Sequence, residues 1–325
     1  MHVPPAPVFV LGVMKSGTTA LCERLFLHPQ LVTAHTLAHE PSHWAKELHF
    51  FDADEMIVGP KASNGTPGRY GKGLAFYHRH FEPFPPPPGH RIVDCTPTYL
   101  GSVEAPRRVA AAYGAAAMPP RFVVVIRDPA DRAVSHWSHA VTMAKKHRSA
   151  GRSNHWTIRL VSRGNFTTFS DMGVALWQQC VRGAWREVAT AAIRAGDEPP
   201  TQWSVCGARG LQSDRGGFVY RGMVDEQLAN WRAFFPAASF CVLTMDALHR
   251  NTSLALRRVA AFLGLSHDGE WAGDQAAAAF AVNRHSHPRQ DLSAHRGAID
   301  RLRSFYATRS ATLARARQGG GWINC

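Results

Sequence analysis

The sequence predicts an α/β fold with a central, mostly parallel sheet between layers of helices. Short apolar runs alternate with helical patterns along most of the 325 residues, which is typical of parallel sheets with helices on both faces. The strongest strand, 121–126 (RFVVVI), is apolar on both faces, as expected of a central parallel strand. Hydrophobic residues make up 45% of the chain, so a disordered, collagenous or coiled-coil protein is excluded.

The predicted elements follow this alternation in order. The expected strands are 8–13, 91–95, 121–126 and 240–244. The expected helices are 18–27, 106–113, 130–146, 224–235, 254–263 and about 298–317. His28-Pro29 ends the first helix, and Pro106 suits the first turn of the second.

Residues from about 145 to 217 interrupt the alternation. A helix in this stretch carries an apolar stripe, which we expect to face a core: Val174, Trp177, Val181, Trp185, Val188 and Ala192. No internal repeat or clean linker is found. We therefore expect one domain over residues 1–325, with an insertion at about 145–217.

Charge and apolar runs limit the partners and the location. The chain has 37 basic and 24 acidic residues, a net charge of +13, which favours anionic partners such as nucleotides or sulfated and carboxylated glycans. A solvated basic surface is the alternative. No apolar run approaches the roughly 18 residues of a membrane span, and no signal peptide precedes the first strand. The chain is therefore expected to be either cytoplasmic or without its anchor.

The six cysteines lack any metal-ligand spacing, so a zinc site is not expected. Cys22 and Cys241 lie in apolar segments and are predicted to be buried thiols. Cys180 and Cys206 could pair if the chain is luminal. Three Asn-x-Ser/Thr sequons favour the same location: Asn64, Asn165 and Asn251.

A glycine-rich turn follows the first strand. Gly12 and Gly17 have the spacing of a P-loop, where backbone N–H groups and a helix N-terminus bind an anion. A Walker sequence has lysine directly after the second glycine, but here Thr18 stands there and the lysine is Lys15. The loop is therefore expected to bind a terminal phosphate without the usual nucleoside-triphosphate lysine, unless it is a chance turn.

Two further segments carry polar groups suited to chemistry. Arg127 ends strand 121–126 and Ser135 follows eight residues later, so the two can bind one phosphate at the carboxyl edge of the sheet. Asp128 can also simply cap the next helix.

In Lys46–Asp52 (KELHFFD), Glu47 and His49 point to one face of an extended segment. A carboxylate beside lysine and histidine can act as a base, although a surface Lys-Glu pair is the plainer interpretation.

Together these motifs resemble the sulfotransferases that use 3′-phosphoadenylyl sulfate (PAPS), and most of all the Golgi heparan sulfate 3-O- and N-sulfotransferases. The resemblance implies a P-loop-like three-layer fold and a PAPS donor, with no metal required. It assigns the 5′-phosphosulfate to Lys15, Ser16, Gly17, Thr18 and Thr19. It assigns the 3′-phosphate to Arg127 and Ser135.

The resemblance also assigns roles at the acceptor. Glu47 matches the catalytic base, and His49 and Asp52 match residues that bind the acceptor. The catalytic residues implied by the resemblance are therefore Glu47, Lys15 and His49. Arg284 matches a late basic loop that closes over the nucleotide. The segment Asp94–Pro97 departs from the family's Glu-Lys-Thr-Pro, because Cys95 replaces the lysine.

The function expected from these observations is transfer of a sulfuryl group from PAPS to a hydroxyl or amine, giving the nucleotide product PAP. The expected partners are the nucleotide donor and an anionic or hydroxylated acceptor, a carbohydrate similar to a glycosaminoglycan, and no nucleic-acid partner is expected. The expected location is the Golgi lumen or membrane, with the cytoplasm as the alternative. Two other functions stay open at this point. One is a P-loop small-molecule kinase, and the other is a non-catalytic module that binds anionic glycans.

Overall fold

The computed structural model describes residues 6–35, 37, 47–52, 69–116, 118–153, 155–211, 217–266 and 291–325, which belong to two structural units. The first unit comprises Met1–Ile126, Trp231–Arg284 and Leu313–Cys325, and the second comprises Arg127–Asn230 and His285–Thr312. The alternation of strands and helices is found in the first unit, whereas the second is helical. That the chain functions as one domain stays a prediction.

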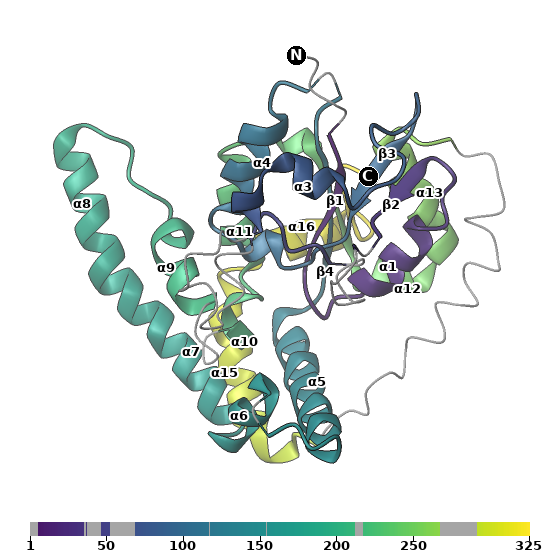
Figure 1. Cartoon of the computed structure of the whole chain (residues 1–325). Helices are drawn as coiled ribbons and strands as arrows, with labels where there is room; N and C mark the ends of the chain where they lie inside the picture. Colours follow the sequence, from purple (N-terminus) through teal and green to yellow (C-terminus); the bar gives the residue numbers. More distant parts are fainter. Residues whose placement is uncertain are drawn as a thin grey trace. The chain divides into compact units, whose positions relative to one another are not determined.

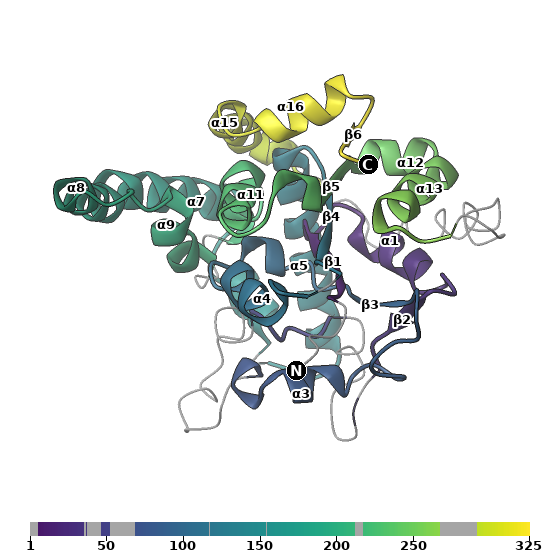
Figure 2. The same ribbon diagram turned by 90° about the horizontal axis from the view of Figure 1, so that it is seen from above.

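The first unit is built on a six-stranded sheet with the order β2-β3-β1-β4-β5-β6; β1 to β4 are labelled in Figure 1, and β5 and β6 can be followed in Figure 2. The strands are β1 (Val8–Gly12), β2 (Leu31–Thr33), β3 (Arg91–Asp94), β4 (Arg121–Ile126), β5 (Phe240–Thr244) and β6 (Trp322–Ile323). Every pairing within this sheet is parallel except that of β5 with β6. The predicted mostly parallel sheet is therefore confirmed.

Helices cover both faces of this sheet, as Figure 2 shows. On one face lie α1 (Thr18–Leu25), α12 (Met245–Arg250) and α13 (Thr252–Leu263), and on the other lies α4 (Ala105–Tyr113). The unit also includes α3 (Leu74–His78) and most of α16 (Ala311–Gln318). This layered arrangement is the P-loop-like three-layer fold that the sequence predicts.

The two faces of the sheet have different cores. The alternation of side chains along a strand turns Val8 and Val10 of β1 toward an aliphatic cluster that includes Leu21 of α1. Phe9 turns to the opposite face, where its ring stacks on that of Phe122 with the centroids 5.8 Å apart. An aromatic layer therefore lies under the side of the sheet away from α1.

The second unit consists of helices. They are α5 (Pro129–Ser149), α6 (Trp156–Ser162), α7 (Phe166–Cys180), α8 (Arg186–Ala195), α9 (Gln202–Leu211), α10 (Gly217–Tyr220), most of α11 (Val224–Arg232) and α15 (Arg296–Ala307). Asp128 caps α5, because its side chain accepts hydrogen bonds from the backbone N–H groups of Ala130 and Asp131. Among the described residues of both units, no helix has the length and apolarity needed to cross a bilayer.

The single helix predicted at about 298–317 is wrong, since two helices, α15 and α16, occupy that stretch. The carboxylate of Asp225 accepts hydrogen bonds from the backbone N–H groups of Ala311, at 2.6 Å, and Thr312, at 2.9 Å. This carboxylate caps the start of α16 and so favours a new helix there. A cap from a residue this distant in the sequence leaves no local pattern.

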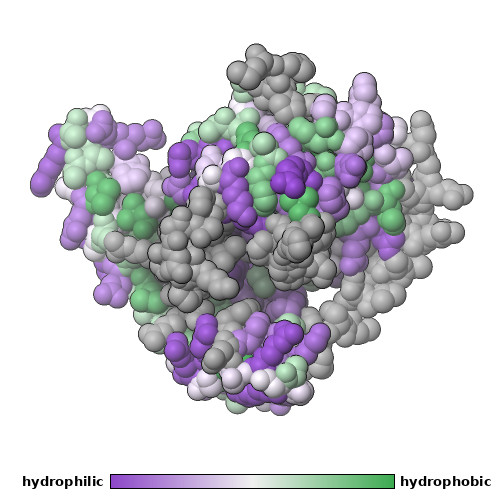
Figure 3. All heavy atoms as spheres, in the orientation of Figure 1, coloured by the Kyte–Doolittle hydropathy of each residue, from purple (hydrophilic) through white to green (hydrophobic). Residues whose placement is uncertain are grey.

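The predicted apolar stripe faces a core over only part of its length. Trp177 of α7 is fully buried, and its ring lies against those of Trp203 and Tyr220. Val188 on α8 is 48% exposed, and the surface around α8 mixes hydrophobic with hydrophilic side chains (Figure 3). A π-helical turn, Val181–Trp185, joins the two helices.

All six cysteines form disulfides. Cys180 pairs with Cys206, as the sequence allows. The prediction that Cys22 and Cys241 are free buried thiols is wrong, because Cys22 pairs with Cys95 and Cys241 pairs with Cys325. Both residues are buried as predicted, but their partners lie 73 and 84 residues away along the chain.

Candidate active site

The predicted nucleotide loop lies between β1 and α1, at the carboxyl end of a central strand. Gly17 has a positive φ of 95° and stands at the N-cap of α1, which has no side-chain cap. The backbone N–H groups of the first turn of a helix attract anions when no side chain caps them. Ser16 is fully buried, Thr18 is buried and Thr19 is exposed. The turn therefore has the geometry of an anion-binding loop.

Lys15 is half-buried in this loop and has a positive φ of 72°. A lysine rarely adopts this backbone conformation, because the Cβ atom of an L-residue is crowded there. Among the described residues other than glycine, only Lys15, His49 and Asn324 have a positive φ. Such strained positions occur preferentially at functional sites, and two of these three are predicted site residues.

The predicted base lies on segment 47–52, which is neither helix nor strand and has a left-handed backbone at His49 instead of the extended one expected. Leu48 and Phe50 are each 1% exposed. Glu47 and His49 keep part of their side chains accessible, 32% and 23% respectively, and Glu47 Oε2 lies 3.6 Å from His49 Nε2. The alternation read from the sequence is thus reproduced, and the carboxylate and the imidazole face each other at the surface.

Asp52 lies on the other side of the His49 ring. Both carboxylate oxygens of Asp52 lie 3.3 Å from His49 Nδ1. The hydroxyl of Thr98 donates to Asp52 Oδ2 at 2.5 Å and lies 3.2 Å from His49 Nδ1. The Asp52 side chain is fully buried, so in this structure it faces His49. A direct contact of Asp52 with an acceptor stays a prediction.

This position between two carboxylates determines the charge of His49. Burial by itself would lower the pKa of His49, but the negative charges and hydrogen bonds of Asp52 and then Glu47 outweigh it and raise the pKa from 6.5 to about 10. The ring is therefore an imidazolium at neutral pH. An imidazolium has no free lone pair, whereas a carboxylate can accept a proton.

Two arginines hold the backbone of this segment from the buried side. Arg69 donates to the carbonyl of Leu48, and Arg108 Nη1 donates to the carbonyl of Phe51 at 2.9 Å. Buried carbonyl groups need such partners. The segment is therefore held along its length as well as at its side chains.

The residues assigned to the 3′-phosphate belong to the second unit. Arg127 directly follows β4, and Ser135 lies in the second turn of α5. Both are partly buried. The capping of α5 by Asp128 is confirmed, so this motif has a structural role whether or not it also binds phosphate.

Lys46 and Arg284 lie outside the described residues. Sequence reasoning missed the residues that support the site from the end of β3 and the segment after it, namely Asp94, Thr96, Thr98 and Tyr99. The signal was present in the unusual Asp-Cys-Thr-Pro-Thr-Tyr run, which drew notice only for the lysine it lacks.

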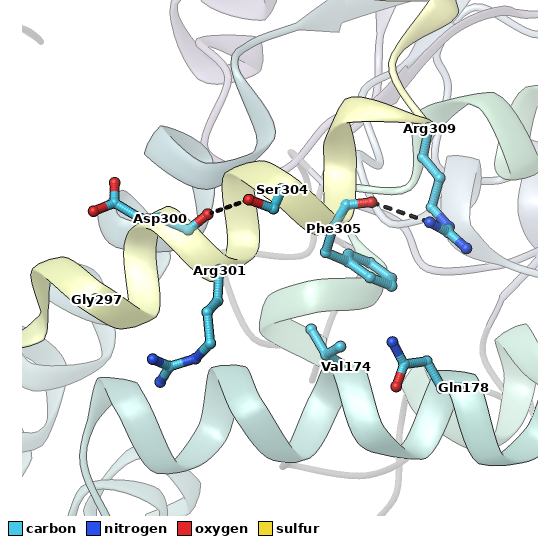
Figure 4. Close-up of a pocket in the computed structure, with 8 residues that line it drawn as sticks. All are labelled: Val174, Gln178, Gly297, Asp300, Arg301, Ser304, Phe305 and Arg309. Carbon is cyan, nitrogen blue, oxygen red and sulfur yellow. Dashed lines mark hydrogen bonds between the residues drawn. The ribbon is translucent and has the colours of Figure 1, made fainter.

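The second unit also has a surface pocket of about 560 Å³ between α7 and α15 (Figure 4). It is lined by Val174, Gln178, Gly297, Asp300, Arg301, Ser304, Phe305 and Arg309. Its two arginines already pair with carboxylates, Arg301 with Asp171 and Arg309 with Glu226. The pocket contains none of the predicted site residues and is a poorer site for an anion than the loop before α1.

A family model described as the sulfotransferase domain matches residues 5–279. The chain therefore belongs to the sulfotransferase domain family. Heparan sulfate glucosamine 3-O-sulfotransferase 6 of Mus musculus is 28% identical over 263 residues, which are 79% of this chain and 51% of that protein. Heparan sulfate glucosamine 3-O-sulfotransferase 5 of Homo sapiens is 30% identical over 132 residues, which are 41% of this chain and 30% of that protein.

Another relative, the membrane-associated sulfotransferase kil1 of Dictyostelium discoideum, is 28% identical over 142 residues, 43% of this chain and 24% of that protein. The chain thus spans about half or less of the length of these relatives. The crystal structure of a sulfotransferase from Alicyclobacillus acidocaldarius is 20% identical and covers 86% of this chain and 93% of that one, with a TM-score of 0.47. A likeness of that size adds nothing to the family assignment.

The charge of His49 gives a direct test of the site. We expect the imidazole to titrate near pH 10 in an NMR titration of the ring signals. His78 is an internal control, because burial lowers its pKa to about 4. Asp52→Asn should lower the pKa of His49 by more than one unit, because the negative charge of Asp52 contributes most to raising it.

The raised pKa also fixes the sign of a pH effect on stability. The pKa of His49 is higher in the folded state than the ordinary 6.5, so its contribution to stability is complete below about pH 6.5 and is lost as the pH rises toward 10. An NMR pKa below 7 for His49 in the wild-type protein would contradict this account.

Proposed function

We propose that this protein transfers a sulfuryl group from PAPS to a hydroxyl or amine of a carbohydrate acceptor. The observation that carries the proposal is the pairing of the Glu47 carboxylate with a charged His49, in a chain of the sulfotransferase family. The net charge of +13 supports an anionic polysaccharide as the acceptor. The heparan sulfate named for two of the relatives indicates the same class.

PAPS, when bound, supplies the sulfuryl group, and the residues of the chain supply charge and a base. We assign its 5′-phosphosulfate to Lys15–Thr19, because the uncapped start of α1 and the lysine ammonium both favour an anion. Lys15 stabilises the negative charge that develops on the phosphate oxygen as its bond to sulfur breaks. The 3′-phosphate is assigned to Arg127 and Ser135, with Arg284 as a further contact.

Glu47 is the proposed base. Its carboxylate accepts the proton of the acceptor O–H or N–H as the new bond to sulfur forms. His49 is already protonated at neutral pH, so it orients the acceptor and balances negative charge instead of taking the proton. Asp52 holds the His49 ring in place through Nδ1.

Incubation with radiolabelled PAPS and a panel of acceptors tests the function. The panel should run from desulfated heparan to small phenols and sterols, and label is expected in the polysaccharide. Phosphorylation of a small molecule from ATP would instead identify a kinase. Binding of sulfated glycans without transfer, unaffected by Glu47→Ala or Lys15→Ala, would identify a binding module.

The same assay identifies the base. Glu47→Gln keeps the size and polarity of the side chain but removes its charge, so kcat should fall by about 10²–10⁴, with the KM for PAPS little changed. Glu104→Gln is a matched control, because Glu104 lies at the surface and pairs with Arg107. Near-normal kcat in Glu47→Gln together with an inactive His49→Ala would show that histidine is the base.

Thermal shifts with PAP test the nucleotide contacts. A ligand at 100 times its Kd stabilises a protein by about 2.7 kcal/mol, and a hydrogen bond to a charged group is worth about 1.5–3 kcal/mol. At one fixed PAP concentration, Lys15→Ala and Arg127→Ala should therefore each lose most of the wild-type shift in Tm. Lys145→Ala removes an exposed charge from α5 and should keep the shift. Equal shifts in all four proteins would count against the assigned contacts.

We further propose that the protein works in the Golgi lumen. The pairing of all six cysteines supports this, because disulfides are typical of oxidising compartments. Asn165 and Asn251, which belong to two of the sequons, are both exposed. Mass spectrometry of the native, unreduced protein should find the three cross-linked pairs, and glycosidase should lower the mass. Free thiols and an unchanged mass would place the protein in the cytoplasm.

A further inference from the structure

Asp94, the last residue of β3, is a buried carboxylate that takes no part in the proposed transfer step. It is 1% exposed. Three hydroxyl groups donate to it: Thr96 to Oδ1 at 2.6 Å, and Tyr77 and Tyr99 to Oδ2 at 3.0 Å each. All three donors are neutral. Burial therefore still dominates and raises the pKa of Asp94 to about 6.

Two of these hydroxyls also accept hydrogen bonds from the segment that carries Glu47. The backbone N–H of His49 donates to Thr96 Oγ1 at 3.4 Å. The N–H of Phe50 donates to the Tyr99 hydroxyl at 2.9 Å, and that of Phe51 lies within 3.4 Å of the same oxygen. Asp94 is thus connected to three successive backbone N–H groups through two side chains.

The carboxylate sets the direction of these hydrogen bonds. A hydroxyl has one proton and two lone pairs, so a hydroxyl that donates to Asp94 presents only lone pairs to the N–H groups. An asparagine at position 94 would bring an N–H₂ donor, and at least one hydroxyl would have to turn its proton away. Only an acceptor with no proton of its own satisfies both hydroxyls at once.

His49 needs such support because its backbone is strained. Its φ is +47°, a conformation in which the Cβ atom of an L-residue is crowded by the backbone. A strained residue persists only where its surroundings hold it in place. The N–H groups held by Thr96 and Tyr99 belong to His49 itself and to the residue after it.

We propose that Asp94 is a positioning residue, which holds the 47–52 segment through Thr96 and Tyr99 and so aims Glu47 and His49. The catalytic consequence rests on the proposed function, but the positioning does not. Burying a charged carboxylate such as Asp94 costs free energy of folding. Holding Thr96 and Tyr99 in the orientation that accepts the N–H groups of the 47–52 segment is a reason for that cost. Asp94 itself has no contact with a substrate in this account.

Two tyrosines provide a matched pair for the test. Tyr77 and Tyr99 are both fully buried and donate to the same oxygen of Asp94 at the same distance. Both rings pack against Phe50 or Phe51 of the 47–52 segment, but only the Tyr99 hydroxyl accepts hydrogen bonds from the backbone of that segment. Tyr77→Phe and Tyr99→Phe should therefore have similar Tm values, because each loses one hydroxyl in the same cluster.

The two variants should differ at the site. In Tyr99→Phe the NMR pKa of His49 should fall by at least one unit and kcat by about 10-fold or more, since small misplacements of reacting groups are costly. In Tyr77→Phe the pKa of His49 should stay within about half a unit of the wild-type value, and kcat should stay within about twofold. The KM for PAPS should not change in either variant.

Thr96 gives a second test that does not depend on the tyrosines. Thr96→Ser keeps the hydroxyl and should behave as the wild type, whereas Thr96→Val keeps the shape and should behave as Tyr99→Phe. Asp94→Asn should also behave as Tyr99→Phe. Equal His49 pKa values and equal kcat in the Phe pair, or in the Ser and Val pair, would overturn the proposal.

The NMR measurement separates this inference from the proposed function. If the wild-type protein transfers no sulfate, the function fails, and the pKa of His49 in the variants still decides whether Asp94 positions the segment. If transfer is found and the variants do not differ, the function holds and Asp94 is only a part of the core.

Discussion

Phe9 of β1 stands opposite Asp94 of β3 in a parallel pairing, and the candidate site depends on this alignment. Because both strands run in the same direction, the loop that follows β1 and the segment that follows β3 leave the same edge of the sheet. The first becomes the turn with Lys15, and the second becomes the run from Asp94 to Tyr99. A shift in the register of these strands would separate the proposed anion loop from the residues that hold His49.

The electrostatics of the site follow from what surrounds a single ring. His49 lies between Asp52, which is buried, and Glu47, which is partly exposed. The inner carboxylate keeps the imidazole charged, and the charged imidazole in turn faces the outer carboxylate. The charges of Asp52 and His49 thereby compensate each other, and the Glu47 carboxylate stays at the surface, where an acceptor can reach it.

Much of the first unit was predictable because its strands leave strong local patterns. Both β4 and β5 have the predicted bounds, since their β-branched and apolar runs are long and buried on both faces. By contrast, β2 has three residues and β6 has two, which is too short for a periodic pattern. The division between α15 and α16 was missed because it depends on Asp225, about 86 residues earlier.

The candidate site shows the same division between local and distant information. Lys15, Glu47 and His49 were found because they lie in short motifs with recognisable spacing. The role of Tyr99 needs the folded chain, because the N–H groups of Phe50 and Phe51 that donate to it lie 49 and 48 residues earlier in the sequence. The role of Asp94 depends on that contact, since Asp94 reaches the 47–52 segment only through the hydroxyls that donate to it. The pairing of Cys22 with Cys95 is another case, since neither sequence neighbourhood indicates a partner.

That disulfide limits which side chains its two positions can accept. The side chain of Cys95 is turned inward to Cys22 and is 1% exposed. A single exchange of Cys95 for lysine would place a charge in the core and leave Cys22 as a solitary thiol. The disulfide joins α1 to the segment that follows β3, across 73 residues of sequence. A substitution at either position therefore also releases these two elements from each other.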